Sequence, residues 1–153
     1  MITLLNHRDP AIAQQIYVVQ QAAYTVERDL IDYPDFPPLR VTVADIQAET
    51  EHFLGYWQDA ALVGVLSFDS KPGLVDIGRL IVHPVAFRRG IASTLLRAVE
   101  HYGEPGGKLT VSTAAKNHPA VQLYQKHGYR LTEQTTLPDG LALVRFDKVV
   151  TTA

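Results

Sequence analysis

Apolar residues recur every three to four positions in three stretches of the chain, the spacing of an amphipathic helix. The first stretch follows Asp9-Pro10, a pair that suits the start of a helix. The second ends at Gly103, and the third starts after Asn117 and ends at Gly128, where glycine can terminate a helix. The predicted helices cover residues 10–28, 89–102 and 117–127.

Six shorter stretches, bounded by turn residues, read as strands. Asp59-Ala60 and Pro138-Asp139-Gly140 each predict the turn of an antiparallel hairpin, and Lys71-Pro72-Gly73 predicts a further turn. The predicted strands cover residues 52–58, 61–69, 74–82, 109–113, 129–136 and 141–149.

Residues 29–41 hold three prolines and three aspartates. Proline removes an amide donor and restricts the residue before it, so this segment is predicted to be an irregular loop. The sequence Thr42-Val43-Ala44-Asp45 that follows is a variant of the capping box, and it predicts a short helix ending near Glu51.

The predicted elements follow one another in the order α-α-β-β-β-α-β-α-β-β. Strand 74–82, helix 89–102 and strand 109–113 form a β-α-β unit, whose two strands should be parallel. Antiparallel hairpins lie on either side of this unit. The predicted fold class is therefore α/β, an α+β sandwich built on a mixed, twisted sheet.

Composition narrows the function classes. The length of 153 residues suits one domain over 1–153. The 14 Lys+Arg against 16 Asp+Glu give a net charge of −2, which argues against nucleic acid as a partner. The absence of cysteine excludes disulfides, cysteine nucleophiles and thiolate metal sites, and the six histidines lack metal-binding spacings, so no metal is expected. No membrane span or secretory signal is recognisable, which predicts a cytoplasmic protein without a membrane partner.

The segment from Val82 to Ala92 joins a predicted strand to a predicted helix. A helix N-terminus offers unpaired N–H groups and a partial positive charge. Gly90 lets a ligand approach the backbone closely, and Arg88 and Arg89 add full positive charges. Together these features could hold a pyrophosphate. The same residues also fit a solvated surface turn.

This segment resembles the acetyl-CoA signature of the GNAT superfamily of N-acetyltransferases, which runs [QR]-x-x-G-x-[GA] with V-x-P shortly before it. Gly90 and Ala92 match its last two fixed positions, whereas Phe87 stands where the family has Gln or Arg. This departure puts a side-chain contact at Phe87 in doubt but leaves the backbone amides available. Downstream, the family pattern N-x-x-A-x-x-[LF]-Y-x-[KR]-x-G-[FY] is matched at seven positions: Asn117, Ala120, Leu123, Tyr124, Lys126, Gly128 and Tyr129.

The resemblance implies a mostly antiparallel sheet with a central parallel strand pair that splays apart, and helices on both faces. It implies acetyl-CoA as the cofactor. Backbone amides around Leu80–Val82 would bind the thioester oxygen and pair with the pantetheine arm. The implied cofactor-binding residues are Leu80, Ile81, Val82, Phe87, Arg88, Arg89, Gly90, Ile91, Ala92, Ser93, Asn117 and Tyr124.

Tyr124 is the candidate catalytic acid, because the family match places its phenol where a thiolate departs. On sequence context alone it also fits a core tyrosine, and Asn117 could simply cap its helix. For the base, Asp76 on the central strand is the candidate. Glu51, His52 and an ordered water are the alternatives.

The proline-rich loop and the end of the preceding helix are the predicted acceptor site. Carboxylates beside aromatic rings suit an amine or ammonium. A solvated loop with aromatic anchors fits the same residues. The candidate substrate-binding residues are Glu27, Asp29, Tyr33 and Phe36.

These features predict an N-acetyltransferase that moves an acetyl group from acetyl-CoA to a primary amine of a small molecule or peptide, directly in a ternary complex. The alternatives are a non-catalytic acyl-CoA-binding sensor or interaction module on the same fold, and a phosphate-binding fold unrelated to coenzyme A. A homodimer formed by pairing of the terminal strands is compatible with the sequence, although no pattern demands it.

Overall fold

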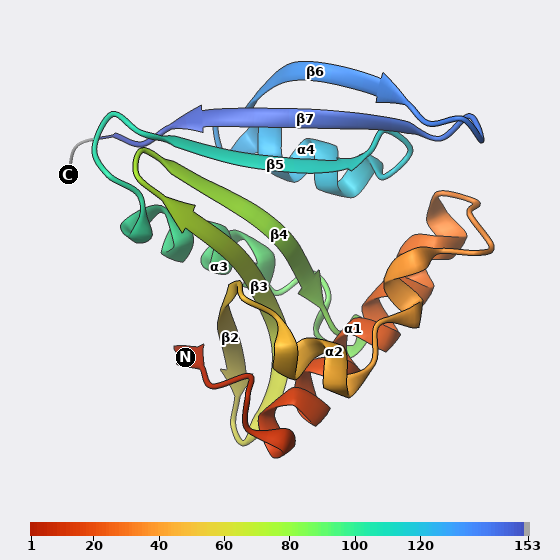
Figure 1. Ribbon diagram of the computed structural model, residues 1–153, viewed down its shortest axis with the longest axis vertical. Helices are drawn as coiled ribbons and strands as arrows, with labels where there is room; N and C mark the ends of the chain where they lie inside the picture. Colours follow the sequence, from red (N-terminus) through yellow and green to blue (C-terminus); the bar gives the residue numbers. More distant parts are fainter. Residues whose placement is uncertain (152–153) are drawn as a thin grey trace.

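The structure, a computed structural model, describes residues 1–151 and contains one mixed seven-stranded sheet in the order β1-β2-β3-β4-β5-β7-β6 (Figure 1). The strands are β1 (Ile2–Leu5), β2 (His52–Gln58), β3 (Ala61–Lys71), β4 (Leu74–Val82), β5 (Lys108–Ala114), β6 (Arg130–Thr136) and β7 (Ala142–Val149). The helices are α1 (Pro10–Leu30), α2 (Val43–Ala48), α3 (Ile91–Val99) and α4 (His118–Lys126). Short 3-10 helices are η1 (Pro37–Arg40), η2 (Pro84–Ala86) and η3 (Glu100–Tyr102).

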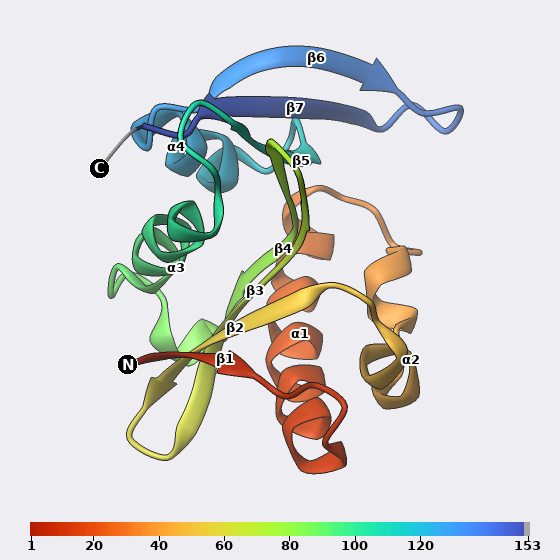
Figure 2. The same ribbon diagram turned by 60° about the vertical axis from the view of Figure 1, so that its left-hand side comes forward.

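Helices cover both faces of the sheet. Figure 2 shows α1 and α2 on one side of β2–β4, and α3 and α4 on the other. Each face has its own apolar core. Ile16, Ile46 and Phe53 are buried in the core under α1 and α2, whereas Leu66, Leu95 and Phe146 are buried in the core on the α3 and α4 side. The helices thereby hold the sheet from both sides, as expected of a three-layer arrangement.

The two central strands run parallel only over their first half. Leu74–Ile77 pairs with Lys108–Val111, and beyond this point β4 continues to Val82 and β5 to Ala114 without pairing to each other. Figure 1 shows β5, β7 and β6 turning away from β2, β3 and β4. The register against β3 shifts between Ile77 and Arg79, which makes Gly78 the extra residue of a bulge. The bulge therefore lies at the point where the sheet divides.

Glu51 explains why the bulge carries a glycine. A β-carbon built on Gly78 would lie 2.1 Å from the Glu51 Oε2 atom. The Ser67 hydroxyl donates a hydrogen bond to Glu51 Oε1 at 3.4 Å. With its carboxylate in this position, Glu51 leaves room only for a residue without a side chain.

The predicted fold class is confirmed, as are both hairpins and the parallel β4–β5 pair. The Thr42–Asp45 capping box is present and starts α2, and the Asn117 side chain caps α4. The predicted strand boundaries agree with the observed ones to within about two residues.

Three elements differ from the prediction. Helix α3 begins at Ile91 rather than at 89, because Arg88 and Gly90 adopt φ values of 65° and 72° and so lie outside the right-handed helix. Its last predicted turn is the 3-10 helix η3. Residues 37–40 of the proline-rich loop form η1. Strand β1 is absent from the prediction: it is four residues long and is held by pairing with β2.

Gly64 on β3 packs against the first turn of α3. A β-carbon built there would lie 2.7 Å from Ile91 Cγ2 and 3.1 Å from Leu95 Cδ1. We therefore expect Gly64→Ala to overpack this contact and to lower the free energy of unfolding by about 1–3 kcal/mol. Urea unfolding measures the change, and a variant as stable as the parent would contradict it.

Candidate active site at the divergence of β4 and β5

Two pockets open where β4 and β5 separate. The sheet pocket, of about 230 Å³, lies between α1, η1, β4, β5, α4 and the start of β7. The loop pocket, of about 470 Å³, lies between α1, the end of β4, the segment before α3, and α4. Six residues line both pockets, so the two spaces meet: Glu27, Leu80, Ile81, Asn117, Ala120 and Tyr124.

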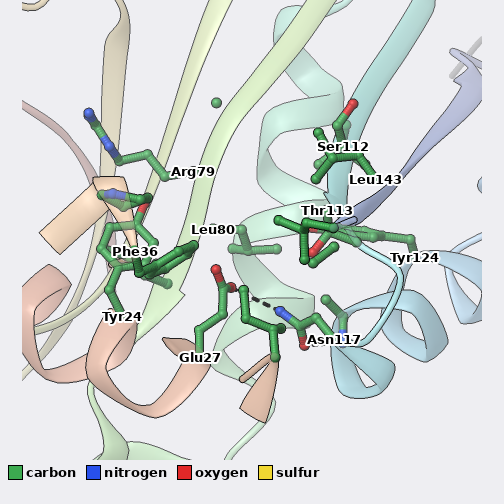
Figure 3. A pocket seen from close by; sticks show the side chains of 18 residues that line it. Tyr24, Glu27, Phe36, Arg79, Leu80, Ser112, Thr113, Asn117, Tyr124 and Leu143 are labelled. Carbon is green, nitrogen blue, oxygen red and sulfur yellow. Dashed lines mark hydrogen bonds between the residues drawn. The ribbon is translucent and has the colours of Figure 1, made fainter. Parts of the chain in front are cut away.

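Asn117 joins the two walls of this junction. Its Nδ2 atom donates a hydrogen bond to Glu27 Oε1 at 2.9 Å, across from α4 to α1 (Figure 3). Its Oδ1 atom accepts a hydrogen bond from the Ala120 N–H at 3.3 Å, which caps α4. One amide side chain therefore starts a helix and fixes the orientation of the Glu27 carboxylate.

Glu27 is a partly buried carboxylate at the junction. Burial raises its pKa above the usual value of 4.5, because removing water penalises the charged form. The hydrogen bond from Asn117 opposes this shift by stabilising the carboxylate. A carboxylate with a raised pKa is suited to accepting a proton near neutral pH.

Tyr124 faces Glu27 from α4. Its side chain is only 5% exposed, and its ring lies 5.8 Å from the rings of both Tyr129 and Phe146. Burial, and then the negative charge of Glu27, raise its pKa above the usual value of 10. The phenol therefore stays protonated and able to donate a hydrogen bond. Tyr124 is thus a core residue whose ring also lines both pockets.

Two backbone amides of β4 point into the gap. The His83 N–H donates a hydrogen bond to the Val63 carbonyl at 2.7 Å, and the register pairs Ile81 with Val65. In an antiparallel pair, successive residues face the partner strand alternately. The N–H groups of Leu80 and Val82 are therefore directed away from β3, toward the space left by β5. This edge can bind an extended ligand.

The segment before α3 brings part of the predicted cofactor site together. Phe87, Arg88 and Ala92 line the loop pocket, as do Leu80, Ile81, Val82, Asn117 and Tyr124. Gly90 is the N-cap of α3. Like Gly90, the remaining three predicted residues lie outside the lining.

These three side chains have other contacts. Arg89 donates a hydrogen bond to Gln58 Oε1 at 2.8 Å, and Ile91 is 3% exposed in the core. The Ser93 hydroxyl lies 3.0 Å from the His127 ring nitrogen. Their contribution to cofactor binding stays a prediction, and it would come through their backbone or through rearranged side chains.

The predicted acceptor residues separate in space. Glu27 and Phe36 line the sheet pocket, and Tyr33 hydrogen-bonds to Asp139 outside that lining. Asp29 is exposed and pairs with Arg28 at 3.2 Å. The sequence did not point to several other lining residues, which come from separate elements and share no spacing: Tyr24, Arg79, Ser112, Thr113, Leu141 and Leu143.

The candidate base Asp76 lies on the half of β4 that is still paired with β5. It accepts a hydrogen bond from the Thr110 hydroxyl at 2.7 Å and lines neither pocket. The alternative candidate Glu51 lies beside Gly78, which does line the sheet pocket, and burial raises the Glu51 pKa. Glu27, predicted only as a substrate-binding residue, is the carboxylate at the junction itself.

Residues 1–151 hold neither a cluster of metal-binding side chains nor a helix that could span a membrane. The side chains there form no group of three or more His, Cys, Asp or Glu residues that could hold a metal ion. None of the helices in this range is both long and apolar enough to span a membrane.

Comparisons with known proteins agree with this geometry. The chain is 40% identical over 146 residues to the UPF0157 protein YqkA of Bacillus subtilis (strain 168). The matched region covers 95% of this chain but only 43% of YqkA. The chain thus spans less than half the length of this curated relative.

Solved structures share the fold. The ribosomal-protein-S18-alanine N-acetyltransferase of Escherichia coli superimposes with a TM-score of 0.76 at 16% identity, over 100% of this chain and 95% of that one. An aminoglycoside 6'-N-acetyltransferase complexed with coenzyme A superimposes with a TM-score of 0.74 at 14% identity, over 100% of this chain and 98% of that one. The family model of the acetyltransferase (GNAT) domain matches residues 37–150. The chain, with its divided sheet and paired pockets, belongs to the GNAT acetyltransferase family.

Proposed function

We propose that this chain transfers an acetyl group from acetyl-CoA to a primary amine, directly within a ternary complex. The observation that carries the proposal is the meeting of two pockets at Glu27, Asn117 and Tyr124. A donor in the loop pocket and an acceptor in the sheet pocket would touch at these residues. No cysteine is present to carry the acetyl group between them.

The loop pocket has the features that coenzyme A requires. The exposed Arg88 lines it, and the N-terminus of α3 supplies unpaired N–H groups beside a flexible glycine backbone. The free amides of Leu80 and Val82 extend from there toward the junction and suit the amide groups of a pantetheine arm. When bound, acetyl-CoA supplies an acetyl group activated by its sulfur.

Acetyl transfer requires a donor to the developing oxyanion, a base that takes a proton from the amine, and an acid that protonates the departing sulfur. The residues at the junction can supply all three. An amide of Leu80 or Val82 donates to the carbonyl oxygen as negative charge develops on it. The amine nitrogen bonds to the carbonyl carbon, and Glu27 accepts the proton that the nitrogen loses. As the carbon–sulfur bond breaks, Tyr124 donates its proton toward the sulfur, and solvent returns a proton from Glu27 to Tyr124.

The two adjacent arginines provide a matched test of the pyrophosphate site. Arg88 lines the loop pocket, whereas the Arg89 side chain is bound to Gln58. We expect Arg88→Ala to raise the Kd for coenzyme A about tenfold, which corresponds to ~1.4 kcal/mol. Arg89→Ala removes the same charge and is expected to change the Kd less. Titration calorimetry measures both, and equal effects would contradict the assignment.

Thiol release separates the proposed enzyme from the alternatives. Incubation with acetyl-CoA and a panel of primary amines is expected to release coenzyme A only when protein and amine are both present. A binding module would show a thermal shift with acetyl-CoA but no amine-dependent thiol. A phosphate-binding fold unrelated to coenzyme A would show the same thermal shift with ATP. The cytoplasmic location and the homodimer stay predictions of the sequence.

A further inference from the structure

We infer that the acceptor is a small monoamine, meaning a primary amine on a mostly apolar body with no second cationic group. This inference rests on the proposed function and specifies the substrate class of the same site. It comes from the side chains that line the sheet pocket, from the charges among them and from a contact between two neighbouring loops.

Apolar side chains make up more than half of the sheet-pocket lining, beside polar ones such as Thr113. Phe36 and Pro38 lie on the side of the proline-rich loop, and Leu141 and Leu143 lie at the start of β7. The pocket volume of about 230 Å³ is below the range of about 300–1,000 Å³ that drug-sized ligands occupy. An acceptor that fits is therefore small and buries an apolar body.

The described lining of this pocket contains two charged residues, Glu27 and Arg79. Glu27 is the carboxylate that meets the reacting amine. Figure 3 shows Arg79 on the side of Tyr24 and Phe36, away from Tyr124 and Thr113. An acceptor that extends away from the junction on that side approaches a positive charge.

Arg79 is held in place by contacts outside the pocket. Its side chain is 11% exposed, its guanidinium lies 4.9 Å from the centroid of the Phe53 ring, and its Nη2 atom lies 3.9 Å from Glu49 Oε2. Glu49 and Glu51 compensate its charge, and neither of them lines the pocket. A second ammonium would thus lose its water without gaining a carboxylate partner, which is costly.

A contact between two loops lies close in sequence to two residues of the pocket lining. The Tyr33 hydroxyl donates a hydrogen bond to the Asp139 carboxylate, joining the loop after α1 to the β6–β7 turn. The Tyr33 ring lies edge-on to Phe36 with centroids 6.3 Å apart. Phe36 and Leu141 line the pocket and follow Tyr33 and Asp139 closely in the sequence, so we expect the Tyr33–Asp139 bond to limit the length of the acceptor.

Two amines of equal length test the charge argument. Hexylamine and 1,6-diaminohexane differ only in the terminal ammonium, and the diamine has two reactive ends. We expect kcat/KM to be at least tenfold higher for hexylamine, measured as thiol release from acetyl-CoA. Equal rates, or a preference for the diamine, would overturn the inference while leaving the proposed function intact. Absence of thiol release with every amine would instead refute the proposed function.

The Tyr33–Asp139 bond is tested with variants that keep the packing. Tyr33→Phe retains the ring against Phe36 and removes the donor, and Asp139→Asn removes the charge of the acceptor. We compare the rate with a hexapeptide that has a free N-terminus to the rate with hexylamine. Each variant is expected to raise this ratio at least threefold. Tyr102→Phe, at an exposed ring on η3, is the control and should leave the ratio unchanged. An unchanged ratio in both Tyr33→Phe and Asp139→Asn would show that the contact does not restrict the acceptor.

Discussion

Replacing Tyr124 with Phe is expected to lower kcat about 100-fold or more, because general acid catalysis typically contributes 10²–10⁴-fold. The variant keeps the ring that packs near Tyr129 and Phe146 and removes the hydroxyl of a residue that lines both pockets. Coenzyme A binding should be nearly unchanged, because the hydroxyl acts on the departing sulfur. Steady-state kinetics and the thermal shift with coenzyme A measure the two effects.

Tyr129 offers a matched control. It is 3% exposed, packs against Tyr124 and lines neither pocket, and its buried hydroxyl has no hydrogen-bond partner within residues 1–151. Tyr129→Phe should therefore leave kcat within about twofold of the parent. If Tyr124→Phe behaves like Tyr129→Phe, Tyr124 has only its packing role.

Glu27→Gln is expected to lower kcat/KM about 100-fold, because the amide has the shape of the carboxylate but cannot take a proton from the attacking amine. Burial raises the pKa of Glu27 above 4.5, so its carboxylate is lost at a higher pH than that of an exposed glutamate. The parent rate should consequently fall as the pH falls through this raised pKa. The acid side of the kcat/KM profile should flatten in the variant.

Asn117→Ser separates this role from a structural one. Serine can still cap α4, but it is too short to replace the amide that donates to Glu27. Losing that donor raises the Glu27 pKa further, so the acid side of the profile should move to higher pH. A profile that stays in place in both variants would show that another group is the base, and Glu51→Gln would then be the next test.

The sequence indicates candidate residues for binding acetyl-CoA more directly than candidate residues for binding the amine. The candidate residues for binding acetyl-CoA lie in two short segments with fixed spacings that a family pattern can match. One segment runs from the end of a strand through two arginines to Gly90, and the other is Asn117–Tyr129. The predicted start of α3 was wrong by two residues, because no sequence pattern indicates that Arg88 adopts a left-handed backbone conformation. Strand β1 was missed because its four residues depend on the edge of β2.

The acceptor side is assembled by the fold. Tyr24, Arg79, Ser112 and Leu141 belong to α1, β4, β5 and the segment before β7, and they meet only because the sheet divides. Gly78 and the carboxylate of Glu51 lie together where the sheet divides, although they are far apart in the sequence. For the same reason the sequence favoured Asp76, whose strand position was recognisable, over Glu27, whose proximity to Tyr124 depends on how α1 packs against α4.

The parallel ladder between the two halves of the sheet has a mechanical consequence. Four residue pairs, Leu74–Ile77 with Lys108–Val111, are the full extent of the strand pairing that links the half formed by β1 to β4 with the half formed by β5 to β7. The two halves form a wedge that is joined by this short ladder at its narrow end, and the Glu27–Asn117 hydrogen bond spans the open end. A ligand that occupies the wedge would brace both halves at once, so loading the donor would itself stiffen the walls that receive the amine.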